Sequence, residues 1–222
     1  MPQPFKLSAV RTILFDFDGT LVDASEAICA SFNEALRSRG LPPRAESALR
    51  PMIGKPLREM FQLAGAADSA AALDDCIQAY RAVFPPLGLK MSRLLPGVRE
   101  TLPRLARFAK LGIVTNRMGD GARQMLEAHG MDSHFQSIVG IERVSQPKPH
   151  PEPVLLGLTD LTTHPSHGVM VGDTTLDILA AMQADVLAVG ITTGSCSAAE
   201  LHASGALRVI DGIAELLDAI DA

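Results

Sequence analysis

Residues 12–23 read TILFDFDGTLVD, an apolar run followed at once by acidic and small residues. Residues 12–15 are apolar or β-branched and predict a strand buried on both faces. The DFDGT run at 16–20 follows this strand at its carboxyl end. In an open parallel sheet, ligands bind outside the carboxyl ends of the strands, so this run is the first candidate site.

Five further apolar runs have the same form, and segments with helical spacing separate the later ones. The runs span residues 111–114, 137–140, 169–171, 186–191 and, more weakly, 207–210. Helical stripes precede Gly130 and Asp185, and Pro103 falls inside another stripe at 98–109, where it should kink or restart the helix. This alternation predicts an α/β fold, a Rossmann-like, doubly wound parallel sheet with helices around it.

One long segment interrupts the alternation after the first predicted strand. Residues 24–93 contain no good strand run, and their apolar positions form helical stripes at 27–36, 57–64 and 72–83. We expect Pro85-Pro86 to end the third helix. The segment carries 9 basic and 7 acidic residues, a charge of +2, so the remainder carries −5 − 2 = −7. The sequence therefore predicts a helical cap at 24–93, inserted into an α/β core of 1–23 plus 94–222.

The composition is that of a globular protein and argues against several classes of partner. Hydrophobic residues make up 47% of the 222 residues, which is too apolar for a disordered chain. The net charge of −5 argues against nucleic acid as the main partner. The longest stretch without charged residues, 186–199, is too short for a bilayer, so we expect no membrane partner. The first residues lack the basic-then-apolar order of a signal peptide, so we expect a cytoplasmic location. We also expect a monomer or a homodimer.

Polar residues also follow the second and fourth predicted strands and occupy the loop between the third and fourth. They are Thr115-Asn116, Lys148 in QPKPHP at 146–151, and Asp173 and Asp177 in GDTTLD at 172–177. With Asp16 and Asp18, four carboxylates and one ammonium meet at one edge, a charge of −3 that is unfavourable without compensation. A hard divalent cation with oxygen ligands resolves this, and Mg²⁺ suits the donor set. Such a site suits a phosphate, to which Lys148 and Thr115 would also bind.

These motifs resemble those of the haloacid dehalogenase superfamily of phosphatases with an aspartate nucleophile. They are DFDGTLVD at 16–23, TN at 115–116, KPHP at 148–151 and GDTTLD at 172–177. The helical insertion is similar to the cap of the phosphoglycolate phosphatase-like branch. The strings VTN, KPHPEP, VGDTTLDI and IGKPL resemble sequence motifs of the same branch. The resemblance implies a Mg²⁺-dependent phosphoric monoester hydrolase that acts on a small-molecule phosphate ester.

The resemblance also implies a role for each motif residue. Asp16 attacks phosphorus and forms an aspartyl-phosphate, while Asp18 protonates the leaving oxygen and later deprotonates the attacking water. Mg²⁺ is held by the Asp16 carboxylate, the Asp18 carbonyl and Asp173. Asp177 supports the metal's waters or Lys148, or is simply an acid that the helix dipole favours in the first turn. Gly19 permits a tight turn that Thr20 helps to fix. The candidates for binding phosphate or substrate are Thr115, Asn116, Lys148, Gly19 and Lys55.

Several other functions share parts of this pattern. Carbon–halogen cleavage needs neither the second aspartate of the first motif nor the metal, and phosphonate-cleaving relatives usually lack that aspartate, so Asp18 and Asp173 argue against both. A sugar-phosphate phosphatase or a phosphomutase stays open, because mutases of this branch keep Asp18 and differ mainly in the cap. Receiver signalling domains are about half this length and lack a helical cap. A non-catalytic phospho-ligand binder would be expected to have lost Asp16 or Asp18.

The cap should choose the substrate, since the core motifs recognise only a phosphoryl group and a metal. Arg50, Lys55 and Arg58 cluster around the loop at 50–56, where Gly54 and Pro56 predict a defined turn. Lys55 could there bind a carboxylate-bearing substrate such as 2-phosphoglycolate. The alternative is that all three are solvated surface charges at a helix start.

Overall fold

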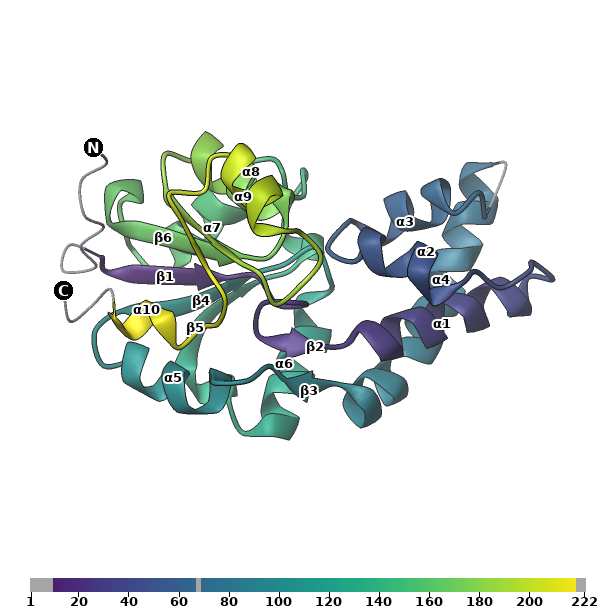
Figure 1. The fold of residues 1–222 in the computed structure, drawn as a ribbon. Helices are drawn as coiled ribbons and strands as arrows, with labels where there is room; N and C mark the ends of the chain where they lie inside the picture. The colour runs from purple at the N-terminus through teal and green to yellow at the C-terminus, as the bar shows by residue number, and fades with distance from the viewer. Residues whose placement is uncertain (1–9, 67–68, 219–222) are drawn as a thin grey trace.

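The computed structural model describes residues 10–66 and 69–218, and a six-stranded parallel sheet lies at its centre (Figure 1). The strands are β1 Thr12–Phe15, β4 Lys110–Val114, β5 Phe135–Val139, β6 Gly168–Gly172, β7 Leu187–Ile191 and β8 Arg208–Ile210. They lie in the order β5-β4-β1-β6-β7-β8, and each neighbouring pair is parallel. The six strand runs in the sequence are confirmed, and the fold is the predicted α/β class.

β1 lies in the middle of the sheet between β4 and β6. Leu14 of β1 pairs with Gly112 on one side and with Met170 on the other. Because the strands are parallel, the residues that follow β1, β4 and β6 come together at one edge. The sheet winds outward in both directions from β1, and ligands of doubly wound sheets bind at such a switch point.

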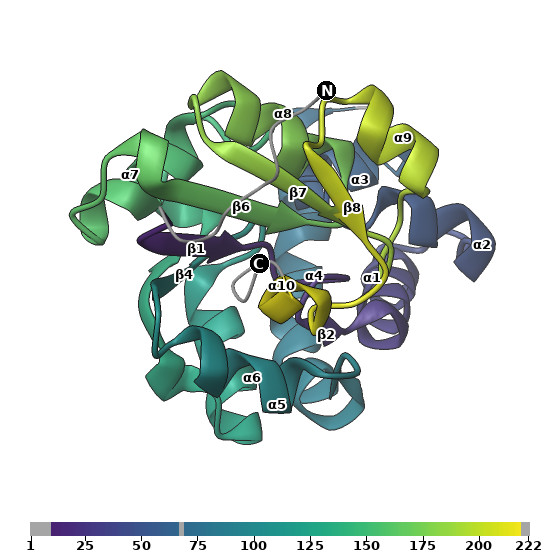
Figure 2. The same ribbon diagram turned by 60° about the vertical axis from the view of Figure 1, so that its left-hand side comes forward.

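Helices cover both faces of the sheet (Figure 2). One face carries α7 Glu152–Asp160, α8 Thr175–Gln183 and α9 Ala198–Ala203; the other carries α5 Val98–Leu105, α6 Gly119–His129 and α10 Glu215–Asp218. Side chains of β1 alternate between the two layers: Leu14 belongs to one buried apolar cluster, and Ile13 and Phe15 belong to the other. Burial on both faces explains why the strands read as continuous apolar runs.

Four further helices lie beyond the carboxyl edge of the sheet, and the arrow of β1 points toward them (Figure 1). They are α1 Ser25–Ser38, α2 Glu46–Leu49, α3 Leu57–Leu63 and α4 Ala70–Met91. The chain enters and leaves this group through an antiparallel pair, β2 Val22–Asp23 and β3 Arg93–Leu94, which the sequence did not predict because two residues show no periodicity. The cap is thus present, and the division at 23/24 and 93/94 stays a prediction. Single 3-10 turns span Arg50–Met52, Asp132–His134, Ile141–Arg143 and Pro165–His167.

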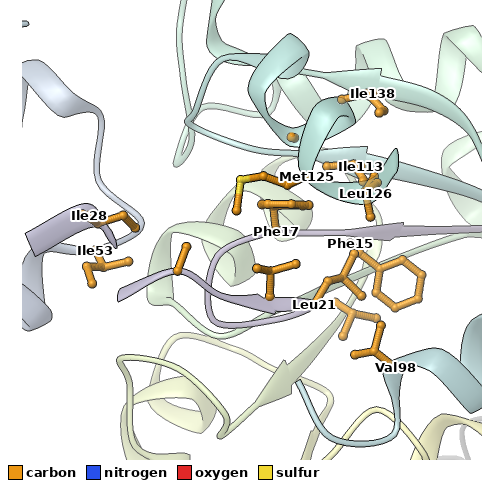
Figure 3. Close-up of a cluster of buried hydrophobic side chains, with 14 of the residues drawn as sticks. Phe15, Phe17, Leu21, Ile28, Ile53, Val98, Ile113, Met125, Leu126 and Ile138 are labelled. Carbon is orange, nitrogen blue, oxygen red and sulfur yellow. The ribbon is translucent and has the colours of Figure 1, made fainter. Parts of the chain in front are cut away.

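One apolar cluster runs from the sheet into the cap (Figure 3). It contains Phe15 and Phe17 from the first strand and its following loop, Met125 from α6, and Ile28 and Ile53 from the cap segment. Phe17 is fully buried, although it stands between two acidic residues. The alternation of Asp16, Phe17 and Asp18 therefore places one large apolar side chain in the core and two carboxylates near the cap.

The prediction that Pro85-Pro86 ends a helix is wrong, because α4 continues through both prolines to Met91. Each proline removes one hydrogen bond to the carbonyl four residues earlier, on Arg81 and Ala82. Both prolines and both of those residues are exposed, so water can satisfy the carbonyls. Phe84 and Gly88 stay buried on the opposite side and keep the helix packed. No helix within residues 10–66 and 69–218, α4 included, has the length and apolar character of a membrane span.

The restart expected at Pro103 is also not observed, since α5 passes through this residue and ends two residues later, at Leu105. Pro103 lies in the last turn of α5, where it leaves only the carbonyl of the exposed Arg99 without its helical partner.

Candidate active site

The candidate site lies where the carboxyl edge of the sheet faces the cap. A cavity of about 790 Å³ lies there, and both parts of the chain line it. The core contributes Asp16, Asp18 and Thr115, among others, and the cap contributes Lys55 and Tyr80. The three core residues follow β1 and β4, as the sequence predicted from the strand ends. The edge of the sheet is therefore the floor of a cavity that the cap partly covers.

Lys148 joins two buried aspartates at the floor of the site. Its Nζ donates to Asp16 Oδ1 at 2.7 Å, to Asp177 Oδ1 at 2.5 Å and to the carbonyl of Val114 at 2.8 Å. Lys148 is only 2% exposed. An ammonium has three donors, and here all three are engaged within the protein. Lys148 thus bridges the predicted nucleophile and Asp177, with no donor left over for a phosphate in this arrangement.

Asp177 has two functions that the sequence presented as alternatives. Its Oδ2 accepts hydrogen bonds from the backbone N–H of Thr174 at 3.0 Å and from the Thr174 hydroxyl at 2.7 Å. These contacts form the capping box of α8. Its other oxygen holds Lys148, so the side chain both starts the helix and orients the buried ammonium.

The electrostatics of this cluster depend on burial and on the crowding of like charges. Desolvation, together with repulsion from Asp177, raises the pKa of Asp16 to about 7, although Lys148 opposes the shift. Desolvation and the neighbouring carboxylates of Asp16 and Asp177 likewise raise the pKa of Asp173. Burial by itself would lower the pKa of Lys148, but the two carboxylates outweigh it and raise that pKa. The cluster therefore holds more negative charge than its one ammonium balances.

Asp16, Asp173 and Asp177 form a donor set that could hold a metal ion. One carboxylate oxygen from each lies within 4.8 Å of the others, and all three residues are buried. Oxygen donors with excess negative charge suit a hard cation such as Mg²⁺. This set includes Asp177 in addition to the predicted Asp16 and Asp173, whereas the carboxylate of Asp18 points to a different partner.

Gly19 and Thr20 position Asp173. Thr20 donates its hydroxyl proton to Asp173 Oδ1 at 3.0 Å, and the N–H of Ser195 donates to Oδ2 at 2.9 Å. Gly19 has a φ of +87°, and a Cβ there would lie 2.6 Å from Asp173 Oδ2. The N–H of Gly19 donates to the carbonyl of Val22 at 2.8 Å, which engages it in the turn rather than with a phosphate.

Thr115 and Asn116 lie side by side at the end of β4 but make different contacts. Asn116 Oδ1 accepts the N–H of Lys148 at 3.1 Å, and its Nδ2 donates to the Gly54 carbonyl at 2.9 Å. The Asn116 side chain thus links the lysine loop to the cap. Thr115 Oγ1 accepts the N–H of Arg117 at 3.3 Å, so its own hydroxyl proton stays available for a phosphate oxygen.

Arg117 is one residue that the sequence analysis missed. Its Nε donates to Asp18 Oδ2 at 2.7 Å, and the two side chains are only 12% and 11% exposed. Asp18 Oδ1 is buried and makes no hydrogen bond to any described residue. The predicted charge of −3 for the site becomes −2 once Arg117 is counted. Its position directly after Thr115-Asn116 was the available signal, but a sequence does not show which way a side chain points.

The basic residues of the predicted cap loop have different surroundings. Lys55 lines the cavity, but its Nζ donates to Glu59 Oε1 at 2.6 Å. Arg58 also lines it and pairs with Asp74. Arg50 is not among the described lining residues; it pairs with Glu46 and donates to Ser25 Oγ at 2.9 Å. The expected cluster of three basic residues is therefore divided, and each member has an acidic partner.

Arg81 of α4 is a second residue that the sequence analysis did not select. It is exposed and lines the cavity from the cap side. Within the described parts of the chain, no ion pair joins Arg81 to an acidic residue. The cap side of the cavity is thus lined by three basic residues, Lys55, Arg58 and Arg81, and by Asp74; with Glu59, the partner of Lys55, their charges sum to +1.

Comparisons with known proteins agree with this geometry. The sequence profile of haloacid dehalogenase-like hydrolases matches residues 13–191. The pyrophosphatase PpaX of Bacillus velezensis is 33% identical over 94% of this chain and 95% of its own, and the phosphoglycolate phosphatase of Yersinia pestis is 30% identical over 97% and 95%. A solved haloacid dehalogenase-like family hydrolase from Streptococcus pneumoniae is 26% identical, covers 95% of this chain and 98% of its own, and superposes with a TM-score of 0.84.

Proposed function

The chain belongs to the haloacid dehalogenase-like hydrolase family and is a phosphatase, and we propose that it hydrolyses small phosphate monoesters through an aspartyl-phosphate on Asp16 with the help of Mg²⁺. The observation that carries this proposal is the buried Asp16 carboxylate, held by Lys148 at 2.7 Å beside Asp173 and open to the cavity. A carboxylate that is oriented, desolvated and close to a cation-binding set is suited to nucleophilic attack on phosphorus.

Two residues of the first motif have separate roles in the reaction. A carboxylate oxygen of Asp16 forms a bond to phosphorus as the bond to the leaving oxygen breaks, and Asp18 supplies the proton that the leaving oxygen takes up. Asp18 then accepts a proton from water as the water oxygen attacks phosphorus, which releases phosphate and restores the Asp16 carboxylate. Thr115 donates its hydroxyl proton to a phosphate oxygen, and Lys148 holds Asp16 in place.

The donor set of Asp16, Asp173 and Asp177 is the place for Mg²⁺, with the Asp18 carbonyl as the further ligand that the family resemblance implies. The bound ion would neutralise charge on the phosphoryl group. Thr20 and the N–H of Ser195 hold Asp173 for this role, and the turn at Gly19 lets the backbone approach that carboxylate.

We infer that the leaving group carries an anionic group of its own. The cap side of the cavity has a charge of +1 once Glu59, the partner of Lys55, is counted, and Arg81 has no acidic partner among the described residues to neutralise it. The names of the two relatives, a phosphoglycolate phosphatase and a pyrophosphatase, both indicate substrates with a second anionic group beyond the phosphoryl group. The cavity of about 790 Å³ also has room for a sugar phosphate, so charge rather than size would discriminate.

The test is phosphate release from para-nitrophenyl phosphate, 2-phosphoglycolate, pyrophosphate and glucose 6-phosphate, with Mg²⁺ or with EDTA. We expect turnover only with Mg²⁺, a higher kcat/KM for the two small anionic substrates than for the sugar phosphate, and loss of turnover in Asp16→Asn. Asp75→Asn, an exposed change in the cap, is the matched control. Activity of Asp16→Asn near that of the wild type would contradict the assignment of Asp16 as the nucleophile. A preference for glucose 6-phosphate would favour a sugar phosphatase or a mutase.

A further inference from the structure

Arg117 lies where the acid–base residue of the core meets the long helix of the cap. Its Nε donates to Asp18 Oδ2 at 2.7 Å. Its guanidinium carbon lies 5.2 Å from the ring centre of Phe17 and 4.7 Å from that of Phe84. Phe17 belongs to the first motif and Phe84 to α4, so one side chain contacts the proton-transfer residue and both parts of the chain.

Further contacts hold the arginine from α6 and from α4, and it also lines the cavity. Its Nη1 approaches Met125 Sδ of α6 at 2.9 Å. Phe84 is stacked on Tyr80, one turn earlier in α4, at 5.4 Å between ring centres. A guanidinium over aromatic faces, with low exposure, gains both packing and cation–π attraction. The position of Arg117 therefore depends on how the cap helix packs on the core.

The contact with Asp18 distinguishes the two oxygens of its carboxyl group. Arg117 engages Oδ2, while Oδ1 is buried and makes no hydrogen bond within the described residues. A buried polar oxygen without a partner is costly, so its missing partner is expected among the reactants. A group fixed at one oxygen has a defined direction for proton transfer at the other.

From these contacts, and given the proposed phosphatase mechanism, we infer that Arg117 is a positioning residue that aims Oδ1 of Asp18 at the leaving oxygen, and that Phe84 of the cap holds Arg117 in that position. Proton transfer to the leaving group is then efficient only while α4 is packed on the core. A cap variant can in this way impair catalysis without touching the substrate.

The test compares kcat/KM for three esters, because kcat/KM reports only the steps up to departure of the leaving group. Para-nitrophenyl phosphate has a leaving group that needs little protonation; propyl phosphate and 2-phosphoglycolate have alkoxide leaving groups that need it. For Arg117→Ala we expect a loss of about 10²-fold with both alkyl esters and a loss below about tenfold with the aryl ester. The same pattern in Asp18→Asn provides the reference.

Two graded variants test the geometry. Arg117→Lys keeps the charge but not the planar fork, so it should recover only part of the alkyl-ester activity. Phe84→Leu keeps an apolar side chain but removes the ring face, and should reduce the alkyl-ester value by about two- to fivefold. Arg123→Ala, an exposed arginine of α6, and Phe108→Leu, an exposed ring that does not line the cavity, should leave the aryl-to-alkyl ratio unchanged.

The three substrates separate the outcomes. A loss confined to 2-phosphoglycolate would overturn the inference and make Arg117 a ligand of the substrate's second anionic group. Equal losses with all three esters, or no loss, would also overturn it. Thermal unfolding of each variant detects a fold defect, and a folded Arg117→Lys then replaces Arg117→Ala in the comparison. Retained turnover in Asp16→Asn would instead overturn the proposed function. The aryl-to-alkyl ratio of kcat/KM tests only the role of Arg117.

Discussion

Adding Mg²⁺ should stabilise the protein against unfolding, and the effect should grow with pH. The buried set of Asp16, Asp173 and Asp177 exists only in the folded chain, so the ion binds the native state alone. At a concentration 100 times Kd, such binding adds about 2.7 kcal/mol to the free energy of unfolding. For a chain of this size, that corresponds to an increase in Tm of roughly 5–11 °C.

The dependence on pH follows from the pKa of Asp16, which burial raises to about 7. Without metal, the native state binds a proton at Asp16 that the unfolded state has lost above about pH 4, so stability falls as pH rises from about 4 to 7. Mg²⁺ must displace that proton below pH 7. The stabilisation by Mg²⁺ should therefore be about 1 kcal/mol smaller at pH 6 than at pH 7, or roughly 2–4 °C in Tm, and should level off above about pH 8.

The assay is thermal unfolding at pH 6, 7 and 8 with either EDTA or a fixed excess of Mg²⁺. Asp173→Asn should lose most of the Mg²⁺-dependent increase in Tm, whereas Asp75→Asn, half exposed and paired with Arg39, should keep it. Equal increases at pH 6 and pH 8 would refute the coupling to a buried carboxylate. An undiminished increase in Asp173→Asn would refute the metal site itself.

Three further outcomes are expected. Lys148→Met removes the cation from two buried carboxylates and should lower the free energy of unfolding by about 3–5 kcal/mol in urea at pH 8; a loss below about 1 kcal/mol would contradict the ion cluster. Gly19→Ala combines a φ of +87° with a Cβ 2.6 Å from Asp173 Oδ2, and should cost at least about 1–2 kcal/mol by thermal unfolding. Arg81→Ala should raise KM for 2-phosphoglycolate about tenfold in steady-state kinetics, more than Lys55→Ala does, because Lys55 is already paired with a carboxylate; the reverse order would exclude Arg81 as the anion ligand.

The strands could be predicted because burial on both faces of a parallel sheet produces a continuous run of apolar residues in the sequence. Residues 13–15 and 169–171 are apolar without interruption, and both lie in central strands. Three cap helices, α1, α3 and α4, are marked in the same local way, by apolar stripes that match one helical face, whereas the four residues of α2 are too few to show one. The end of α4 was mispredicted because the rule for Pro85-Pro86 considers the backbone alone, whereas exposure of the affected carbonyls and the packing of Phe84 allow the helix to continue.

The sequence could assign residues to the site mainly where those residues follow a predicted strand. Asp16, Thr115 and Asp173 each follow a predicted strand, and parallel strands bring their carboxyl ends together. Lys55 was selected by its charge and loop, but the structure pairs it with Glu59. Arg81 was passed over, since an arginine within a helical stripe has no feature that marks it as facing a cavity.

Local periodicity and the polar residues after each strand are enough to derive the α/β sheet, the helical insertion and the aspartates of the site. Their physical cause acts within one segment, through burial of one face or the end of one strand. The pairing of Asp18 with Arg117, 99 residues apart, has a different origin. It depends on the loops after β1 and β4 and on Phe84 of the cap meeting in three dimensions. Such a contact produces no pattern in the sequence of either segment, and only the packing of the core against the cap determines it.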